Sequence, residues 1–354
     1  MVSDCPSPNR GPRVHIDGAG IIGLSCAWLL SRRGADVSIC DVAQPGRGAS
    51  WAAAGMLAPA YEIAMQGHGL DSPLGEFAFA AAAAWPGFAA DLSSLAEGKR
   101  FLLETDTLAV ASDAGDREKL SIFMDRLNAS GIAFDALPAE ALVRLEPALS
   151  PTILTGLRLP TDRQVDHRAV IAALIDANLR AGTRFLDGST SADVTISCKG
   201  WQDVHCQPVK GQMIALRKVA QSPTHIIRSQ SLYVVPKKDR ILIGATEEYG
   251  RVDRDVDIAA TDELLRRAIE VCPSLADAPV MDRWAGIRPG TESGMPLIGW
   301  GDPQRRTFIA TGHFRHGILM APLTARIVAD AIVDGVMDPL AVPFAPTATA
   351  PAIS

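Results

Sequence analysis

The chain has 354 residues, a length that favours two domains or one large α/β unit over a single small core. Hydrophobic residues make up 47% and charged residues 21%, which is typical of a folded globular protein and argues against wholesale disorder. The formal net charge is -6 and no long Lys or Arg run occurs, so the basic surface that nucleic-acid binding requires is missing. We therefore expect no nucleic-acid partner.

Several other classes of protein lack support in the sequence. The six cysteines form no CxxC pair, which predicts reduced thiols and a cytoplasmic location. The histidines show no metal-ligand spacing, and no GxSxG or GxxxxGK[ST] motif occurs, so we expect no metal site, serine-hydrolase chemistry or P-loop. Residues 1–13 are polar and proline-rich and predict a frayed leader rather than a signal peptide. The apolar stretch 77–90 is too short to cross a bilayer and predicts a packed helix, so we expect no membrane partner.

The first elements in chain order are a strand, a glycine-rich turn, a helix and a second strand. Residues 14–17 predict the first strand, GAGIIG follows it, a helix continues toward Gly34, and residues 36–40 predict the second strand. In this arrangement Gly18 makes the turn, Gly20 lets the backbone approach a pyrophosphate, and Gly23 lets the helix pack close to the sheet. The pattern predicts a dinucleotide-binding site.

An acidic residue stands where a ribose-binding carboxylate belongs. Asp41 follows the second strand, 18 residues after Gly23, and can accept hydrogen bonds from the ribose hydroxyls of an adenosine. We also assign cofactor contacts to its neighbour Val42 and to Ile21 and Ile22 in the glycine turn. Asp17 is unusual before the first glycine, and it either points away from the phosphates or is partly protonated. These residues alone do not distinguish NAD from FAD.

The segment 46–59 is a run of very small residues that predicts a loop approaching a planar ring closely. Its string Ala-Ala-Ala-Gly-Met-Leu, residues 52–57, resembles the glycine oxidase branch of the D-amino-acid oxidase superfamily. The resemblance implies that FAD is the cofactor and that this segment lies against the flavin and its diphosphate. The residues of this segment that we assign to FAD binding are Ala49, Ser50, Ala54, Gly55 and Met56.

The resemblance continues in family order from residue 14 to about residue 335. Segments 231–236 and 241–247, broken at 237–240, predict a hairpin, and helices are predicted at 262–272 and about 319–334. The implied fold class is α/β: an FAD-binding Rossmann-like domain of the GR2 type, interleaved with an α+β substrate domain on a large antiparallel sheet. We assign 1–60, 145–210 and 281–345 to the FAD-binding domain, 61–144 and 211–280 to the substrate domain, and 346–354 to a disordered tail.

The substrate site is predicted from three side chains. A guanidinium grips both oxygens of a carboxylate in one plane, and Arg288, in a Gly-Ile-Arg-Pro-Gly motif, matches the family arginine that binds the substrate carboxylate. Tyr233 matches the tyrosine that adds a hydroxyl to that carboxylate, and Arg315 matches a second arginine beside flavin and substrate. No general base stands out. The segment that follows the strand predicted at 307–310 is expected to cradle the flavin through His313, Phe314, Arg315, His316, Gly317, Ile318 and Leu319.

The resemblance implies an FAD-dependent amino-acid oxidase of the glycine oxidase type. Its expected reaction converts glycine, sarcosine or a small D-amino acid to an imine and glyoxylate while oxygen becomes hydrogen peroxide. The imine is expected to supply the thiazole of thiamine by transfer to thiazole synthase, and the enzyme is expected to be a homo-oligomer. Three alternatives stay open: a D-amino-acid dehydrogenase that reduces a quinone, a nicotinamide-dependent dehydrogenase, and an inactive flavin-binding module.

Three positions depart from the family pattern. The region 185–208 is short where a small sheet usually contacts the adenosine, which places adenosine affinity in question. Glu247 stands near the substrate where some relatives carry an apolar residue, and Ser231 stands where some carry histidine. Either change alters the preferred size of the substrate.

Overall fold

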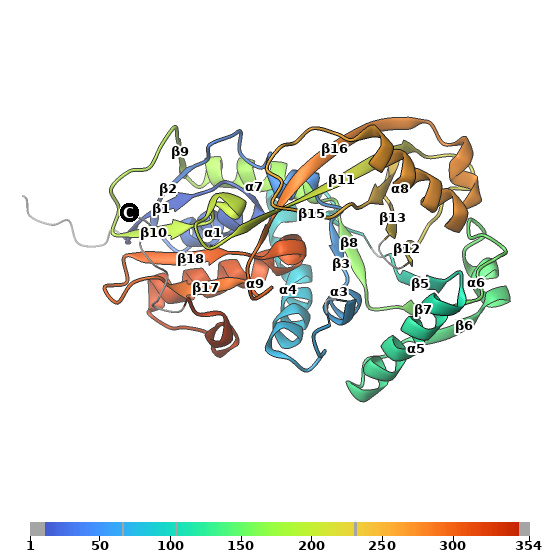
Figure 1. Cartoon of the computed structure of the whole chain (residues 1–354). Helices are drawn as coiled ribbons and strands as arrows, with labels where there is room; N and C mark the ends of the chain where they lie inside the picture. The colour runs from blue at the N-terminus through green and yellow to red at the C-terminus, as the bar shows by residue number, and fades with distance from the viewer. Residues whose placement is uncertain (1–10, 66, 104, 230–231, 347–354) are drawn as a thin grey trace, which may run out of the picture.

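The computed structural model describes residues 11–65, 67–103, 105–229 and 232–346. The predicted leader up to residue 10, the tail from residue 347 and Ser231 lie outside the described residues. The described chain contains a six-stranded, a nine-stranded and a three-stranded sheet. In Figure 1 the six-stranded sheet lies on the left and most of the nine-stranded sheet on the right, with the long strands β11 (Gln207–Arg217) and β16 (Val280–Gly290) running between them.

The six-stranded sheet carries the glycine turn. Its strands follow the order β17-β18-β10-β1-β2-β9 and are parallel except for the antiparallel pair β17 and β18. The predicted strands at 14–17, 36–40 and 307–310 are all present, and the short region after residue 184 contributes two more. The bounds are β1 Arg13–Asp17, β2 Asp36–Cys40, β9 Arg184–Leu186, β10 Val194–Ser197, β17 Leu297–Trp300 and β18 Thr307–Thr311.

Helices α1 (Ile21–Arg32) and α9 (Gly317–Ala329) pack against strands of this sheet, and α1 also contacts α9 and α7 (His167–Arg180). Helix α9 begins two residues before the predicted position and continues as a π-helical turn over Asp330–Asp334. The stretch Phe314–Asp334 is long and apolar enough to cross a membrane, with a mean hydropathy of 1.4, but 72% of it is buried inside the protein. Burial of this extent is typical of a core helix.

The nine-stranded sheet is the predicted large antiparallel sheet, with one parallel pair. Its strand order is β15-β11-β14-β13-β12-β5-β7-β6, and β16 also pairs with β11. Strand β12 pairs with β5 in parallel. The predicted hairpin is present as β13 and β14. A tight turn forces the two strands of a hairpin to be antiparallel, whereas β5 and β12 come from distant segments without that constraint. The bounds are β5 Thr107–Ala111, β6 Asp135–Pro138, β7 Thr155–Leu159, β12 Ile226–Ser229, β13 Leu232–Pro236, β14 Arg240–Gly244 and β15 Glu248–Tyr249.

The sheet pairings also differ from the predicted segment boundaries. Strand β7 and all but the first residue of β16 fall in 145–210 and 281–345, which we assigned to the FAD-binding domain, yet both strands pair within the nine-stranded sheet. Hydrogen bonding between strands far apart in sequence decides sheet membership, and a local pattern does not reveal it. The division into two domains itself stays a prediction.

The segment of small residues is not simply a loop. It contains the short helix α2 (Ala49–Ala52) and strand β3 (Met56–Leu57), and helix α3 (Pro59–Met65) follows. Strand β3 joins β8 (Arg163–Val165) and β4 (Leu102–Leu103) in the three-stranded sheet. The predicted helix at 262–272 is α8 (Ile258–Val271), which starts earlier because Asp257 caps it by accepting from the Ala260 amide.

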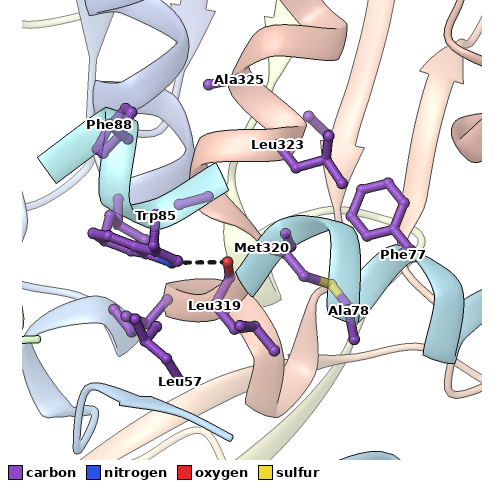
Figure 2. Packing of buried hydrophobic residues seen from close by; sticks show 14 of the residues in the cluster. Leu57, Phe77, Ala78, Trp85, Phe88, Leu319, Met320, Leu323 and Ala325 are labelled. Carbon is purple, nitrogen blue, oxygen red and sulfur yellow. Dashed lines mark hydrogen bonds between the residues drawn. The ribbon is translucent and has the colours of Figure 1, made fainter. Parts of the chain in front are cut away.

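The apolar stretch 77–90 lies within helix α4 (Pro73–Leu95), as predicted. This helix packs against α9, and Figure 2 shows Trp85, Phe88 and Phe77 of α4 beside Leu319, Met320 and Leu323 of α9. The Trp85 indole Nε1–H donates to the Leu319 carbonyl oxygen at 2.9 Å, so the one polar atom of this buried ring is satisfied. Helices α5 (Ala114–Ala129) and α6 (Ala139–Leu145) complete the described α-helices.

Candidate cofactor and active site

A long pocket extends from the glycine turn of the six-stranded sheet to the central strands of the nine-stranded sheet. Its empty volume is about 1630 Å³, including the part open to solvent. It brings together nearly all the predicted site residues, from Asp41 after β2 to Tyr233 on β13. Only Gly18 and Gly23 of the predicted set are not among the lining residues.

Gly18 and Gly23 shape the turn rather than the pocket wall. Gly18 has a φ of 110°, which L side chains rarely adopt, and a Cβ there would collide with the carbonyl oxygen of Cys198. A Cβ at Gly23 would collide with the Gly18 carbonyl oxygen. Both positions therefore require glycine so that helix α1 can start directly above β1.

Polar groups already organise the amino end of α1. The Asp41 carboxylate accepts hydrogen bonds from the Ala19 amide at 2.7 Å and the Ala43 amide at 2.9 Å. The Ser50 hydroxyl oxygen accepts from the Ile21 amide at 2.9 Å. Because a carboxylate has about four acceptor sites, Asp41 keeps acceptor capacity for a sugar hydroxyl. These hydrogen bonds hold Asp41 and Ser50 at the amino end of α1, where both side chains line the pocket.

Asp17 points away from this turn, toward the short region that follows β9. Its carboxylate accepts from the Ser189 hydroxyl at 2.8 Å and lies 3.3 Å from the Lys199 ammonium. Burial alone would raise the pKa of Asp17, but the hydrogen bonds from Ser189 and Cys40 and the Lys199 charge lower it. The alternative of a partly protonated Asp17 is therefore wrong. Lys199 and Trp201 line the pocket, and our sequence reasoning assigned no cofactor contact to either.

Two tryptophans hold the segment of small residues against the large sheet. The Trp284 indole Nε1–H donates to the Ala52 carbonyl oxygen at 3.0 Å, and the Trp51 and Trp284 rings meet edge to face at 5.8 Å. The Trp51 carbonyl oxygen accepts from Arg168 Nε at 3.2 Å. A Cβ at Gly286 of β16 would collide with the Ala52 methyl group. Helix α2 and β16 are thus in direct contact at one edge of the pocket.

Arg288 and Tyr233 lie in the same pocket, and two strand glycines make room for them. A Cβ at Gly211 of β11 would collide with the Arg288 guanidinium, and a Cβ at Gly244 of β14 would collide with the Tyr233 phenol. Glycine within a strand often marks such a close approach. The Arg288 guanidinium donates to the Thr246 carbonyl oxygen at 3.3 Å. Sequence reasoning assigned no role to Gly211 or Gly244, although both leave space for a predicted site residue.

The Tyr233 phenol is a hydrogen-bond donor over the whole neutral pH range. Burial raises its pKa above the ordinary value of 10.0, although the positive charges of Arg288 and Arg228 act in the opposite direction. Its hydroxyl lies 3.6 Å from the Met213 sulfur, a weak acceptor. A carboxylate oxygen is a much stronger acceptor for this hydroxyl than the thioether.

The segment after β18 reaches the pocket through a turn at positive φ, with Gly312 at 73° and Phe314 at 48°. Arg315 follows and forms an ion pair with Glu247, the acidic residue singled out in the sequence. His313 Nε2 lies 3.1 Å from the Thr324 hydroxyl of α9. Burial lowers the pKa of His313 to about 3 and that of His316 to about 4, so both imidazoles are neutral near pH 7.

A second ion pair, Glu62 with Arg228, was not predicted. Glu62 lines the pocket, and the Arg228 guanidinium carbon lies 4.2 Å from the centre of the Tyr61 ring and 5.6 Å from that of Tyr233. Burial alone would raise the pKa of Glu62, but the Arg228 charge lowers it, so the carboxylate is ionised. No local signal indicated this pair, because Arg228 and Glu62 are 166 residues apart in sequence.

Residues 13–331 match the FAD-dependent oxidoreductase family, DAO. Glycine oxidase from Geobacillus kaustophilus is 31% identical over an alignment of 352 positions, which covers 90% of this chain and 92% of that protein. The bifunctional protein ThiO/ThiG from Synechocystis is 30% identical over 94% of this chain and 53% of its own length. The crystal structure of the Geobacillus glycine oxidase superposes with a TM-score of 0.88 at 28% identity, covering 97% of this chain and all of the other. The chain therefore belongs to the DAO family of FAD-dependent oxidoreductases and is an FAD-dependent amino-acid oxidase.

Proposed function

We propose that this enzyme oxidises glycine to its imine, which water converts to glyoxylate and ammonia, while oxygen is reduced to hydrogen peroxide. The overall reaction is glycine plus oxygen plus water to glyoxylate, ammonia and hydrogen peroxide. The observation that carries the proposal is the Arg288 guanidinium beside the Tyr233 phenol in one pocket with the glycine turn. These two groups suit a carboxylate, and the residues around them suit a flavin dinucleotide.

We propose that the residues predicted from the sequence hold FAD. The α1 amino terminus with Gly20 would bind the diphosphate, Asp41 the ribose, and residues 49–56 and 313–319 the flavin. The bound flavin would accept the two electrons and the α-hydrogen of the substrate and pass the electrons on to oxygen.

The substrate is fixed by the chain itself. Arg288 would grip the α-carboxylate through two N–H groups, and the Tyr233 hydroxyl would donate a third hydrogen bond to it. This clamp positions the small molecule and limits its rotation, which is the main contribution that the protein makes when no general base is required. The amine reacts in its neutral form, so proton loss to solvent precedes oxidation.

We propose that the imine also supplies thiazole formation in thiamine biosynthesis. The relative named bifunctional protein ThiO/ThiG supports this, because the matched part is joined to a second part in one chain. A cytoplasmic location is part of the proposal, since the five cysteines of the described residues are free thiols. Two further predictions rest on the resemblance. The enzyme is a homo-oligomer, and it also accepts sarcosine and small D-amino acids.

Anaerobic mixing of the holoenzyme with glycine tests the proposal, with the flavin absorbance as the readout. We expect bleaching by glycine, and on admission of air one hydrogen peroxide for each glyoxylate. Bleaching without peroxide would indicate a quinone or another acceptor, and a flavin that no small amino acid bleaches would indicate an inactive module.

Arg288→Ala should lower kcat/KM for glycine by about thirtyfold or more, because loss of a charged partner costs about 2 to 5 kcal/mol. Arg266→Ala is the matched control, since Arg266 forms exposed ion pairs with Glu263 and Glu270 on helix α8. Unchanged turnover in Arg288→Ala would contradict the proposed carboxylate site.

A further inference from the structure

Around Tyr233 the pocket is lined by Arg288, Arg315 and Glu62, and two of these have an oppositely charged partner behind them. Arg228 is paired with Glu62, and Arg315 is paired with Glu247. Arg288 donates to a backbone carbonyl oxygen and has no carboxylate partner among the residues that the structure describes. Among these three guanidinium groups, that of Arg288 is therefore the uncompensated one.

The charges of these groups act on a common region. Arg288, Arg228, Glu62 and Arg315 all influence the pKa of the Tyr233 phenol through their charges. Arg228, Arg288 and Arg315 reach this region from strands β12 and β16 and from the short 3₁₀ turn Phe314–His316 (η3). A substrate held by Arg288 and Tyr233 consequently lies within the field of both ion pairs.

The two pairs differ in how firmly they are held. The side chains of Arg228 and Glu62 are 5% and 13% exposed, so breaking that pair leaves a charge buried without compensation. The side chains of Arg315 and Glu247 are 36% and 27% exposed, and their pair is accessible to solvent. Glu247 lies between β14 and β15, where it also accepts a hydrogen bond of 2.5 Å from the Tyr249 hydroxyl. The Glu247 charge is thus fixed in place beside Arg315.

We propose that Glu247 is a specificity-determining residue that restricts the site to amines with a single carboxylate. By neutralising Arg315, it removes the second cation that a dicarboxylic amine needs, and its own charge repels a second carboxylate. Without this charge, Arg288 and Arg315 each bind one carboxylate. The inference rests on the proposed function, because it assumes that Arg288 binds the α-carboxylate.

Glu247→Gln tests the inference, because the amide keeps a hydrogen-bond acceptor for Arg315 and loses only the charge. We expect the ratio of kcat/KM for iminodiacetate or D-aspartate to kcat/KM for glycine to rise by about tenfold to hundredfold, the range expected for one charged hydrogen bond. We also expect malonate, which has no amine, to bind more tightly relative to acetate. Perturbation of the flavin spectrum measures both dissociation constants without turnover.

Glu263→Gln is the matched control, because it removes a carboxylate from an exposed Arg–Glu pair on α8 and should leave both ratios unchanged. If the only role of Glu247 is to hold the turn before α9 in place, Glu247→Gln will lower FAD retention and will lower activity equally for every substrate. Unchanged ratios, or a wild-type enzyme that accepts dicarboxylates as well as glycine, would overturn the inference. Failure of glycine to bleach the wild-type flavin would instead contradict the proposed function, and the malonate-to-acetate comparison still decides the role of Glu247.

Discussion

At the scale of single residues, the pocket around Arg288 and Tyr233 depends on these two side chains and on two neighbouring glycines. Arg288 and Tyr233 occupy space that Gly211 and Gly244 leave free on the neighbouring strands. The sequence indicated the two functional side chains through motifs, whereas the role of the two glycines depends on strand register. Tyr233 lies opposite Gly244 in the β13–β14 pair, and no local pattern reports that pairing.

The Tyr233 hydroxyl yields a prediction about pH. Tyr233→Phe should lower kcat/KM for glycine by about tenfold or more, because a hydrogen bond to a charged group contributes about 1.5 to 3 kcal/mol. Since burial raises the pKa of this phenol above 10.0, wild-type Tyr233 stays protonated up to pH 9. Measurements of kcat/KM for both proteins between pH 6.5 and 9 should therefore give a constant ratio. A ratio that falls steadily toward one in this range would mean that the phenol ionises there.

At the scale of elements, local pattern predicted several helices and strands but few of their long-range contacts. The strand-turn-helix-strand unit and the hairpin follow from periodicity and glycine placement, which are local signals. Helix α2 was not predicted because its four residues are too few to show an apolar period. The pairs Glu62–Arg228 and Arg315–Glu247 were also missed, since each joins segments that meet only in the folded chain.

The contact between α2 and β16 gives the prediction at this scale. Gly286→Ala should push β16 away from Ala52 and destabilise the protein by about 1 to 3 kcal/mol, the usual cost of overpacking. Because α2 lines the pocket, we also expect FAD to be lost more readily during gel filtration. Gly188→Ala, at an exposed position where a Cβ meets no atom within 4 Å, should change neither property. Full FAD retention and an unchanged melting temperature in Gly286→Ala would show that the contact is not tight.

At the scale of the whole molecule, three buried histidines link stability to pH. Burial lowers the pKa values of His167, His313 and His316 below the ordinary 6.5, so the unfolded chain binds more protons than the folded one when the pH falls below about 6.5. Burial of these neutral imidazoles contributes fully to the free energy of unfolding above that pH. This contribution is lost as the pH falls toward the pKa values of the imidazoles in the folded protein. The sequence did not show this, because burial of a histidine depends on what packs over it.

Lowering the pH from 6.5 to 5 should reduce the free energy of unfolding by about 2 kcal/mol for each such histidine, at about 1.4 kcal/mol per pH unit. Urea unfolding at a series of pH values measures this slope. His167→Gln should make the slope shallower by about one proton, whereas Gly188→Ala, at an exposed position without a titratable group, should leave it unchanged. An identical slope in His167→Gln would show that this imidazole is not kept neutral by burial.

The hydrogen bond between Trp85 and the Leu319 carbonyl limits how the enzyme can move during its catalytic cycle (Figure 2). It ties the first turn of α9, which lines the pocket, to the middle of the long helix α4 within the shared apolar core. Sliding of α9 would break this hydrogen bond and leave the Trp85 indole N–H buried without an acceptor, at a cost of several kcal/mol. The first turn of α9 should therefore keep its position while substrate enters and product leaves.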